Sequence, residues 1–94
     1  MEEEISYDST TLKAYPNPFS KKLNVKFTAT QSGNAHVELF DVRGTSVHVL
    51  YEGRMSAGEN QEKELETSTL PDGIYILQFV NGKHLYRLKL MGIQ

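Results

Sequence analysis

The sequence predicts an all-β protein, a small antiparallel immunoglobulin-like β-sandwich of about seven strands. Apolar and polar residues alternate over several short runs, which is the pattern of strands that bury one face. Clusters of glycine, proline, asparagine and aspartate separate these runs at intervals of about 8–12 residues, as they do in sandwich domains. No stretch of the sequence shows helical periodicity. Together these observations favour two packed sheets joined by tight turns.

Length and composition narrow the class of protein further. A chain of 94 residues forms one domain with a modest core. Its net charge of −2 differs from the basic excess of nucleic-acid-binding modules. The sequence has no cysteine, which excludes disulfides, thiol catalysis and cysteine-zinc sites. No apolar run approaches the about 20 residues that span a bilayer, so we expect no transmembrane segment and no nucleic-acid partner.

The N-terminal residues differ from the rest. Residues 1–11 are polar and acidic without periodicity, and we expect them to be a linker or a start added for expression, followed by one domain at residues 12–94. The N-terminus lacks the apolar core of a signal peptide. Either the protein stays inside the cell, or this chain is the tail of a longer exported protein.

A proline-rich turn opens the domain. Residues 12–15 form an extended piece that leads into Pro16, Asn17, Pro18 and Phe19. Two prolines exclude a helix here. We expect a turn with a structural role, in which Phe19 packs against the core.

Three strands follow this turn. Alternation predicts strands at residues 22–29 and 35–42, and a third strand at residues 47–51. Asp41 and Gly44 delimit a turn between the second and third of these strands. We expect Gly44 to take a positive φ there.

The next segment is strongly acidic. We expect a long loop at residues 52–60 and a strand at residues 61–67, where Glu62, Glu64 and Glu66 share one face. Such charges are typical of an edge strand that is protected from pairing. A glycoside hydrolase needs two carboxylates that face each other across a cleft, so we interpret this row as solvated surface.

A β-hairpin ends the chain. An apolar strand at residues 74–80 is followed by Asn81 and Gly82, the dipeptide that favours a type I′ turn. In the returning strand Leu88 and Leu90 alternate with polar residues. The hairpin is the element around which we expect the rest of the chain to be organised.

This hairpin is also the basic part of the protein. Residues 73–94 carry Lys83, Arg87 and Lys89 and no acidic residue, which gives +3, whereas residues 1–72 sum to −5. An exposed basic face suits docking by charge complementarity or by strand addition. The same charges also suit the protection of a terminal edge strand from aggregation, and the sequence leaves both interpretations open.

Alternation within the strands predicts the core as well. The expected buried side chains are Leu23, Val25, Phe27, Val37, Leu39, Tyr75, Leu77, Leu88 and Leu90. For Tyr75 an alternative stays open, because a shift of one residue in register would bury Ile74 in its place.

No residue pattern indicates catalysis or a cofactor. A metal site would need the fold to bring His36, His48 and His84 together, with Glu38 or Asp41 as a further ligand. We expect three surface histidines instead. The aromatic side chains are expected to fill the core rather than to line a sugar or peptide groove. We therefore expect no enzyme, no cofactor and no metal.

Five short motifs, in order along the chain, resemble one known family. They are YPNPF at residues 15–19, LNVKF at 23–27, VELFDVRG at 37–44, SAGE at 56–59 and LPDGIY at 70–75. With the basic and apolar strand that closes the chain, they resemble the C-terminal sorting domain (type A) of the type IX secretion system of Bacteroidetes. The resemblance covers roughly residues 12–91.

The resemblance implies a role in protein secretion. In that family an N-terminal passenger, fused to the sorting domain, crosses the inner membrane by its own signal peptide. The type IX secretion machinery recognises the folded domain in the periplasm, and the passenger then crosses the outer membrane. A sortase-like protease at the outer membrane usually removes the domain. The parent protein is therefore expected to be secreted or to stay at the cell surface.

The resemblance also implies roles for particular residues. In that family the last two strands carry most of the signal, which here assigns receptor recognition to Gly73, Tyr75, Lys83, Arg87 and Lys89. The structural motif residues are Pro16, Asn17, Pro18, Phe19, Asp41 and Gly44. Family members commonly end in a lysine or arginine, whereas this chain ends in Gln94.

A second function stays open beside the sorting signal. It is a non-catalytic immunoglobulin- or fibronectin-like module that binds a ligand or acts as a spacer. The Pro-Asn-Pro-Phe opening and the Gly-x-Tyr ending also resemble the immunoglobulin-like domain of flagellar-hook capping proteins.

Overall fold

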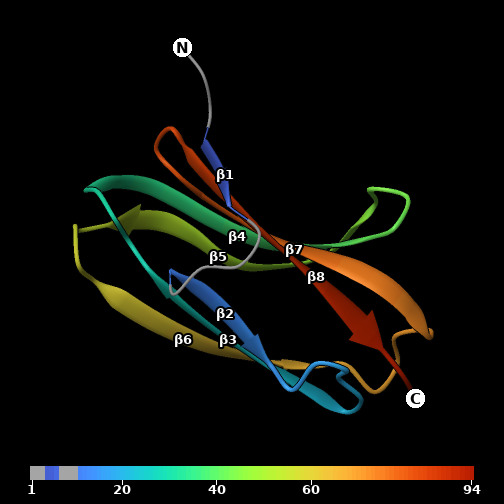
Figure 1. Ribbon diagram of the computed structural model, residues 1–94. Helices are drawn as coiled ribbons and strands as arrows, with labels where there is room; N and C mark the ends of the chain where they lie inside the picture. Colours follow the sequence, from blue (N-terminus) through green and yellow to red (C-terminus); the bar gives the residue numbers. More distant parts are fainter. Residues whose placement is uncertain (1–3, 7–10) are drawn as a thin grey trace.

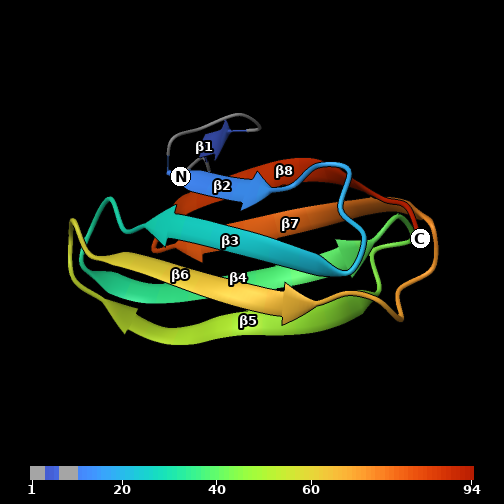
Figure 2. The same ribbon diagram turned by 90° about the horizontal axis from the view of Figure 1, so that it is seen from below.

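The computed structural model describes residues 4–6 and 11–94, which form two β-sheets packed face to face (Figures 1 and 2). The strands are β1 (Glu4–Ser6), β2 (Leu12–Tyr15), β3 (Lys22–Thr28), β4 (Gly33–Asp41), β5 (Ser46–Met55), β6 (Asn60–Glu66), β7 (Gly73–Asn81) and β8 (His84–Gly92). One sheet has the order β1-β8-β7-β4-β5 and the other the order β2-β3-β6. Apart from the short parallel pair β1–β8, all pairs are antiparallel. The predicted all-β sandwich is confirmed.

The core lies between the two sheets and follows the predicted alternation. In β3, Leu23 and Val25 are fully buried, whereas Lys22 and Lys26 on either side of this pair are exposed. Every predicted core residue is buried except Leu88, which is only half-buried. That one prediction was wrong.

Aromatic rings from both sheets meet in this core. Phe27 of β3 lies against Phe79 of β7, with ring centroids 5.3 Å apart and the planes tilted. Such tilted pairs contribute to stability beyond the apolar area that they bury. Tyr75 is 4% exposed and Ile74 is half-buried, so the register buries Tyr75.

Strand β5 is longer than the sequence predicted. The segment at residues 52–55, expected to belong to a loop, continues β5, and the turn into β6 occupies residues 56–59. Opposite β4, the strand contains two irregularities that skip Val47 and Leu50. Both side chains pack against the core instead. Extra residues of this kind bend a strand locally.

β6 and β1 are edge strands of the two sheets, and the sequence predicted only the first of them. β6 forms an edge of the three-stranded sheet, and its Glu62, Glu64 and Glu66 are exposed, as predicted. At the other side of the molecule, residues 4–6 form β1 beside β8, although a linker was expected there. The expectation for residues 1–3 and 7–10 lies outside the described residues.

Candidate interaction surface at the C-terminal hairpin

The described residues offer no metal centre. No group of three or more His, Cys, Asp or Glu side chains that could hold a metal occurs among residues 4–6 and 11–94. His48 is exposed, whereas His36 is half-buried with its Nε2 atom 2.7 Å from Oε1 of Glu38. His84 is half-buried and stacks on Tyr86, with ring centroids 6.2 Å apart. The three histidines thus have separate surroundings, and two of them are less exposed than predicted.

The hairpin of β7 and β8 lies inside the larger sheet, with β4 on one side and β1 on the other (Figure 1). No helix that could cross a membrane occurs in the part of the chain that the structure describes.

Asn81 pairs with His84, so the turn between the strands consists of Gly82 and Lys83. Gly82 has a φ of 62°, and Lys83 has no positive φ. The predicted type I′ turn at Asn81 and Gly82 is therefore wrong, since glycine first in a two-residue turn is the pattern of type II′.

The reason for this difference is the side chain of Asn81, which is fully buried. Its Oδ1 atom accepts hydrogen bonds from the backbone N–H groups of Thr30, at 3.0 Å, and Gln31, at 3.2 Å. Its Nδ2 atom donates to the carbonyl oxygen of Gln31 at 3.2 Å. Asn81 therefore joins the end of the hairpin to the loop between β3 and β4 rather than forming the turn.

The proline-rich turn holds the far end of β8. The amide of Met91 donates to Oδ1 of Asn17 at 3.0 Å, and Nδ2 of Asn17 lies 3.4 Å from the carbonyl oxygen of Lys89. The amide of Phe19 donates to the carbonyl oxygen of Met91, and the amide of Ile93 donates to that of Phe19, both at 2.9 Å. The turn thus continues the sheet beside β8. Both of its X-Pro peptide bonds are cis.

Phe19 also anchors this turn to the core. Its side chain is fully buried, as the sequence predicted, and its ring centroid lies 5.5 Å from that of Tyr75. A methyl group at Gly92 would lie only 2.8 Å from Cζ of Phe19. The close approach of strand and ring therefore requires glycine at position 92.

The last residue of the chain is held by three hydrogen bonds. The amide of Gln94 donates to Oδ1 of Asp72 at 2.8 Å. Its side-chain Nε2 donates to the carbonyl oxygens of Ser20 and Thr67, both at 3.0 Å. Gln94 therefore ties the end of the hairpin to the turns around β3 and β6.

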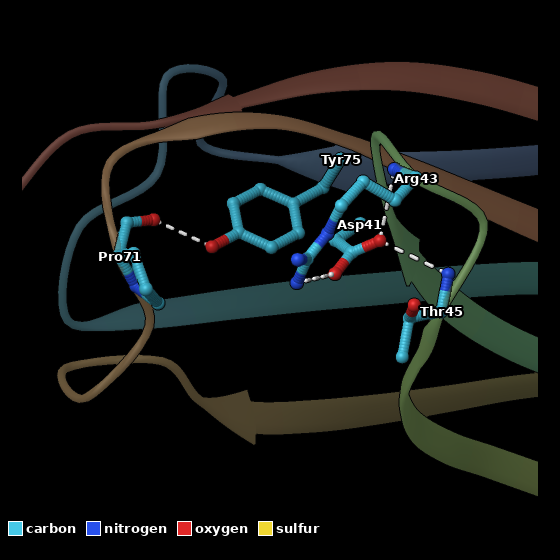
Figure 3. Close-up of polar contacts among 5 residues, drawn as sticks. All are labelled: Asp41, Arg43, Thr45, Pro71 and Tyr75. Carbon is cyan, nitrogen blue, oxygen red and sulfur yellow. Dashed lines mark hydrogen bonds and ion pairs between the residues drawn. The ribbon is translucent and has the colours of Figure 1, made fainter.

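The turn between β4 and β5 is organised by Asp41, shown in Figure 3. Its Oδ1 atom accepts hydrogen bonds from the amides of Arg43, at 2.9 Å, and Thr45, at 3.0 Å. Its Oδ2 atom lies 3.2 Å from Nη2 of Arg43. The hydrogen bond from Thr45, followed by those from Arg43, holds the pKa of Asp41 below its ordinary value. Gly44 has a φ of 84°, which confirms the predicted positive φ.

Tyr75 lies near this turn, with its hydroxyl directed away from it (Figure 3). The hydroxyl donates a hydrogen bond to the carbonyl oxygen of Pro71. Burial raises the pKa of Tyr75, and the charges of Asp41 and Asp72 raise it further. Because the ring is inside the core, Tyr75 presents almost no surface to a partner of the folded domain.

The three basic side chains of the hairpin lie at two places. Lys83 is exposed at the tip between β7 and β8. Arg87 and Lys89 are two positions apart on β8, so they share one face of the sheet. Lys89 is exposed, whereas Arg87 is half-buried and its Nε donates to Oε1 of Gln78 at 2.9 Å. Arg87 and Lys89 therefore form a pair on the outer face of the sheet.

The residues expected to contact a receptor are therefore not one cluster. Gly73 and Tyr75 lie at the start of β7, and Lys83 lies beyond its other end. Only Arg87 and Lys89 are neighbours on one accessible face.

The sequence analysis did not predict that Asn81 and Gly92 are packing residues. An Asn-Gly pair, or a glycine at the end of the last strand, carries no local sign of contacts with distant residues.

A search of curated proteins finds no match to the chain. The family described as the secretion system C-terminal sorting domain matches residues 13–94, which is most of the sequence. The matched residues nearly coincide with residues 12–91, over which the motifs resemble the type IX sorting domain. The chain belongs to the family of type IX secretion system C-terminal sorting domains.

Proposed function

We propose that this domain directs its parent protein across the outer membrane, and that the type IX machinery reads the C-terminal hairpin. The observation that carries the proposal is the placement of Arg87 and Lys89 on one accessible face of a hairpin that has no acidic residue. Residues 12–72 hold seven basic and eight acidic residues, a net charge of −1, so a partner with an acidic surface would be attracted to the hairpin rather than to the rest of the domain. The parent protein then reaches the cell surface or the medium.

The contacts around the hairpin support reading of a folded domain. Asn81 fixes one end of the hairpin, and Asn17, Phe19 and Gln94 fix the other. These contacts fix both ends of the hairpin, and with them the backbone that carries the two basic side chains of β8, before any partner binds. Such preorganisation reduces the entropy that binding has to offset.

The test is the fate of a reporter. A fluorescent protein with a signal peptide, fused to residues 1–94, is expressed in a Bacteroidetes host with an active type IX system. We expect the reporter at the cell surface or in the medium, and we expect a reporter without the domain to stay in the periplasm. Equal delivery of both reporters would contradict the proposal.

The same reporter tests the fate of the domain. In the family resemblance a sortase-like protease at the outer membrane removes the sorting domain, and we propose that this happens here. The delivered reporter should then be shorter by the mass of the domain, as measured by mass spectrometry. A delivered reporter of full length would show that the domain stays attached.

A further inference from the structure

The outward edge of β8 is occupied in the folded domain. β1 pairs with the first residues of the strand. Near its end, Asn17 and Phe19 bond the backbone at Lys89 and Met91. A partner strand would have to displace both segments in order to add to this edge. Recognition of β8 without unfolding therefore uses the outer face of the sheet.

That outer face has an ordered arrangement of side chains. The strand register places Phe40 of β4 opposite Ile76 of β7, and Ile76 opposite Lys89 of β8. The next row contains Gln78 and its partner Arg87. The neighbours of these residues on β4 and β7 point into the core, so the five side chains belong to the solvent side.

A groove of about 460 Å³ lies on this face. Its lining residues are Phe40, Asp41, Val42, Gly44, Ile76, Gln78 and Arg87. Phe40 and Ile76 are half-buried, and Val42 is 72% exposed. The groove therefore combines apolar side chains, which lose water favourably on contact, with a guanidinium at its border.

The acidic groups beside the groove already have partners. The carboxylate of Asp41 is bonded to Arg43 and to the amides of its own turn. Glu38, in the row of Arg87, is bonded to His36. Among the described residues, Arg87 has a hydrogen bond only from Nε, to Gln78. The ion pairs of the described residues do not include Arg87.

We propose that this groove, which includes Phe40, Ile76 and Arg87, is the docking site for the export receptor. The inference rests on the sorting function proposed above and adds where and how the domain is read. The partner is a polypeptide segment that carries a carboxylate next to an apolar side chain. The terminal nitrogens of Arg87 receive the carboxylate in a paired hydrogen bond, and the apolar side chain packs on Phe40 and Ile76.

A matched pair of variants tests the groove. Ile76 and Val80 are half-buried residues on the same face of β7, and only Ile76 lines this groove. Ile76→Thr and Val80→Thr each replace an apolar β-branched side chain by a polar one. Circular dichroism first establishes that both variants are folded. We expect Ile76→Thr to lower surface delivery of the reporter about tenfold, which corresponds to a loss of about 1.4 kcal/mol of binding free energy. The Val80→Thr reporter should be delivered normally. Equal delivery by the two variants would overturn the proposal that this groove is the docking site.

A cross-linking experiment identifies the occupant. A photoreactive amino acid replaces Ile76 in the exported reporter, or Lys26 on the outer face of the other sheet as a control. We expect a cross-link from position 76 to a type IX component, within a peptide that contains Asp or Glu, and none from position 26. A cross-link from position 76 to a second copy of the domain, or to a peptide without an acidic residue, would overturn the proposal.

The outcome also separates this inference from the function on which it rests. If the wild-type domain delivers the reporter and the Ile76→Thr domain does so equally well, the groove is refuted and the sorting function stands. If a reporter without any domain is delivered, the sorting function itself is refuted.

Discussion

The ring of Phe19 lies directly against the backbone of Gly92, so that a methyl group at position 92 would be 2.8 Å from Cζ of the ring. The two residues come from opposite ends of the domain. Their contact joins the proline-rich turn to the last strand, and Phe19 also packs on Tyr75.

The first prediction concerns Gly92. Gly92→Ala should lower the free energy of unfolding by about 1–3 kcal/mol, the usual range for adding a methyl group to a packed site. Urea denaturation of the full chain measures this change. Met91→Ala, at the neighbouring exposed side chain, is the control and should have a small effect. In the double variant Phe19→Leu, Gly92→Ala, we expect the two losses to be less than additive, because the smaller side chain makes room.

The second prediction separates structure from recognition at the proline-rich turn. Phe19→Ala should lower the free energy of unfolding by about 3–5 kcal/mol, because a fully buried ring is removed from the core. Tyr15→Ala, at a side chain that is 42% exposed, should cost much less. An unchanged melting temperature for Phe19→Ala together with lost export would show instead that the turn contacts the receptor.

The third prediction concerns the buried amide of Asn81. In Asn81→Ala, the amides of Thr30 and Gln31 lose their acceptor inside the protein, and each unpaired group costs about 1–3 kcal/mol if it stays buried. The variant should unfold at a clearly lower urea concentration. Asn34→Ala, which changes an exposed side chain, should resemble the wild type. Equal midpoints for both variants would contradict the role of Asn81.

The fourth prediction concerns acid stability. The pKa of Asp41 is lower in the folded protein than its ordinary value of 3.8. Its contribution to stability is therefore fully present above about pH 4 and is lost as the pH falls through the lower folded pKa. Asp41→Asn should have a lower melting temperature than the wild type at pH 6, and the difference should shrink towards pH 2. Parallel melting curves over this range would show that Asp41 does not contribute in this way.

The fifth prediction concerns the two basic residues of β8. Replacement of Arg87 and Lys89 by Gln together should change the free energy of unfolding by less than about 1 kcal/mol, since accessible charges contribute little. The reporter with this double change should accumulate in the periplasm. Lys13→Gln with Lys26→Gln, which removes two exposed charges from the other sheet, is the control. If the folded variant with Gln at both positions reaches the cell surface normally, Arg87 and Lys89 are not needed for recognition.

Alternation of residue types determined much of the fold. The phase of β3, the burial of Leu39 and Leu77, and the exposure of the glutamate row of β6 follow from a period of two residues. These are local properties, because the side chains of a strand point alternately to its two faces whatever lies beyond. For the same reason the sequence placed Arg87 and Lys89 on one face.

Tertiary structure decided the contacts that the pattern does not encode. Asn81 has the local signature of a turn residue, yet its amide is more stable inside the protein, where it satisfies backbone groups of the β3–β4 loop about 50 residues away. The same is true of Asn17, which bonds the last strand across 74 residues. Buried backbone groups need partners, and only the packed sandwich determines which side chain is near enough to supply them.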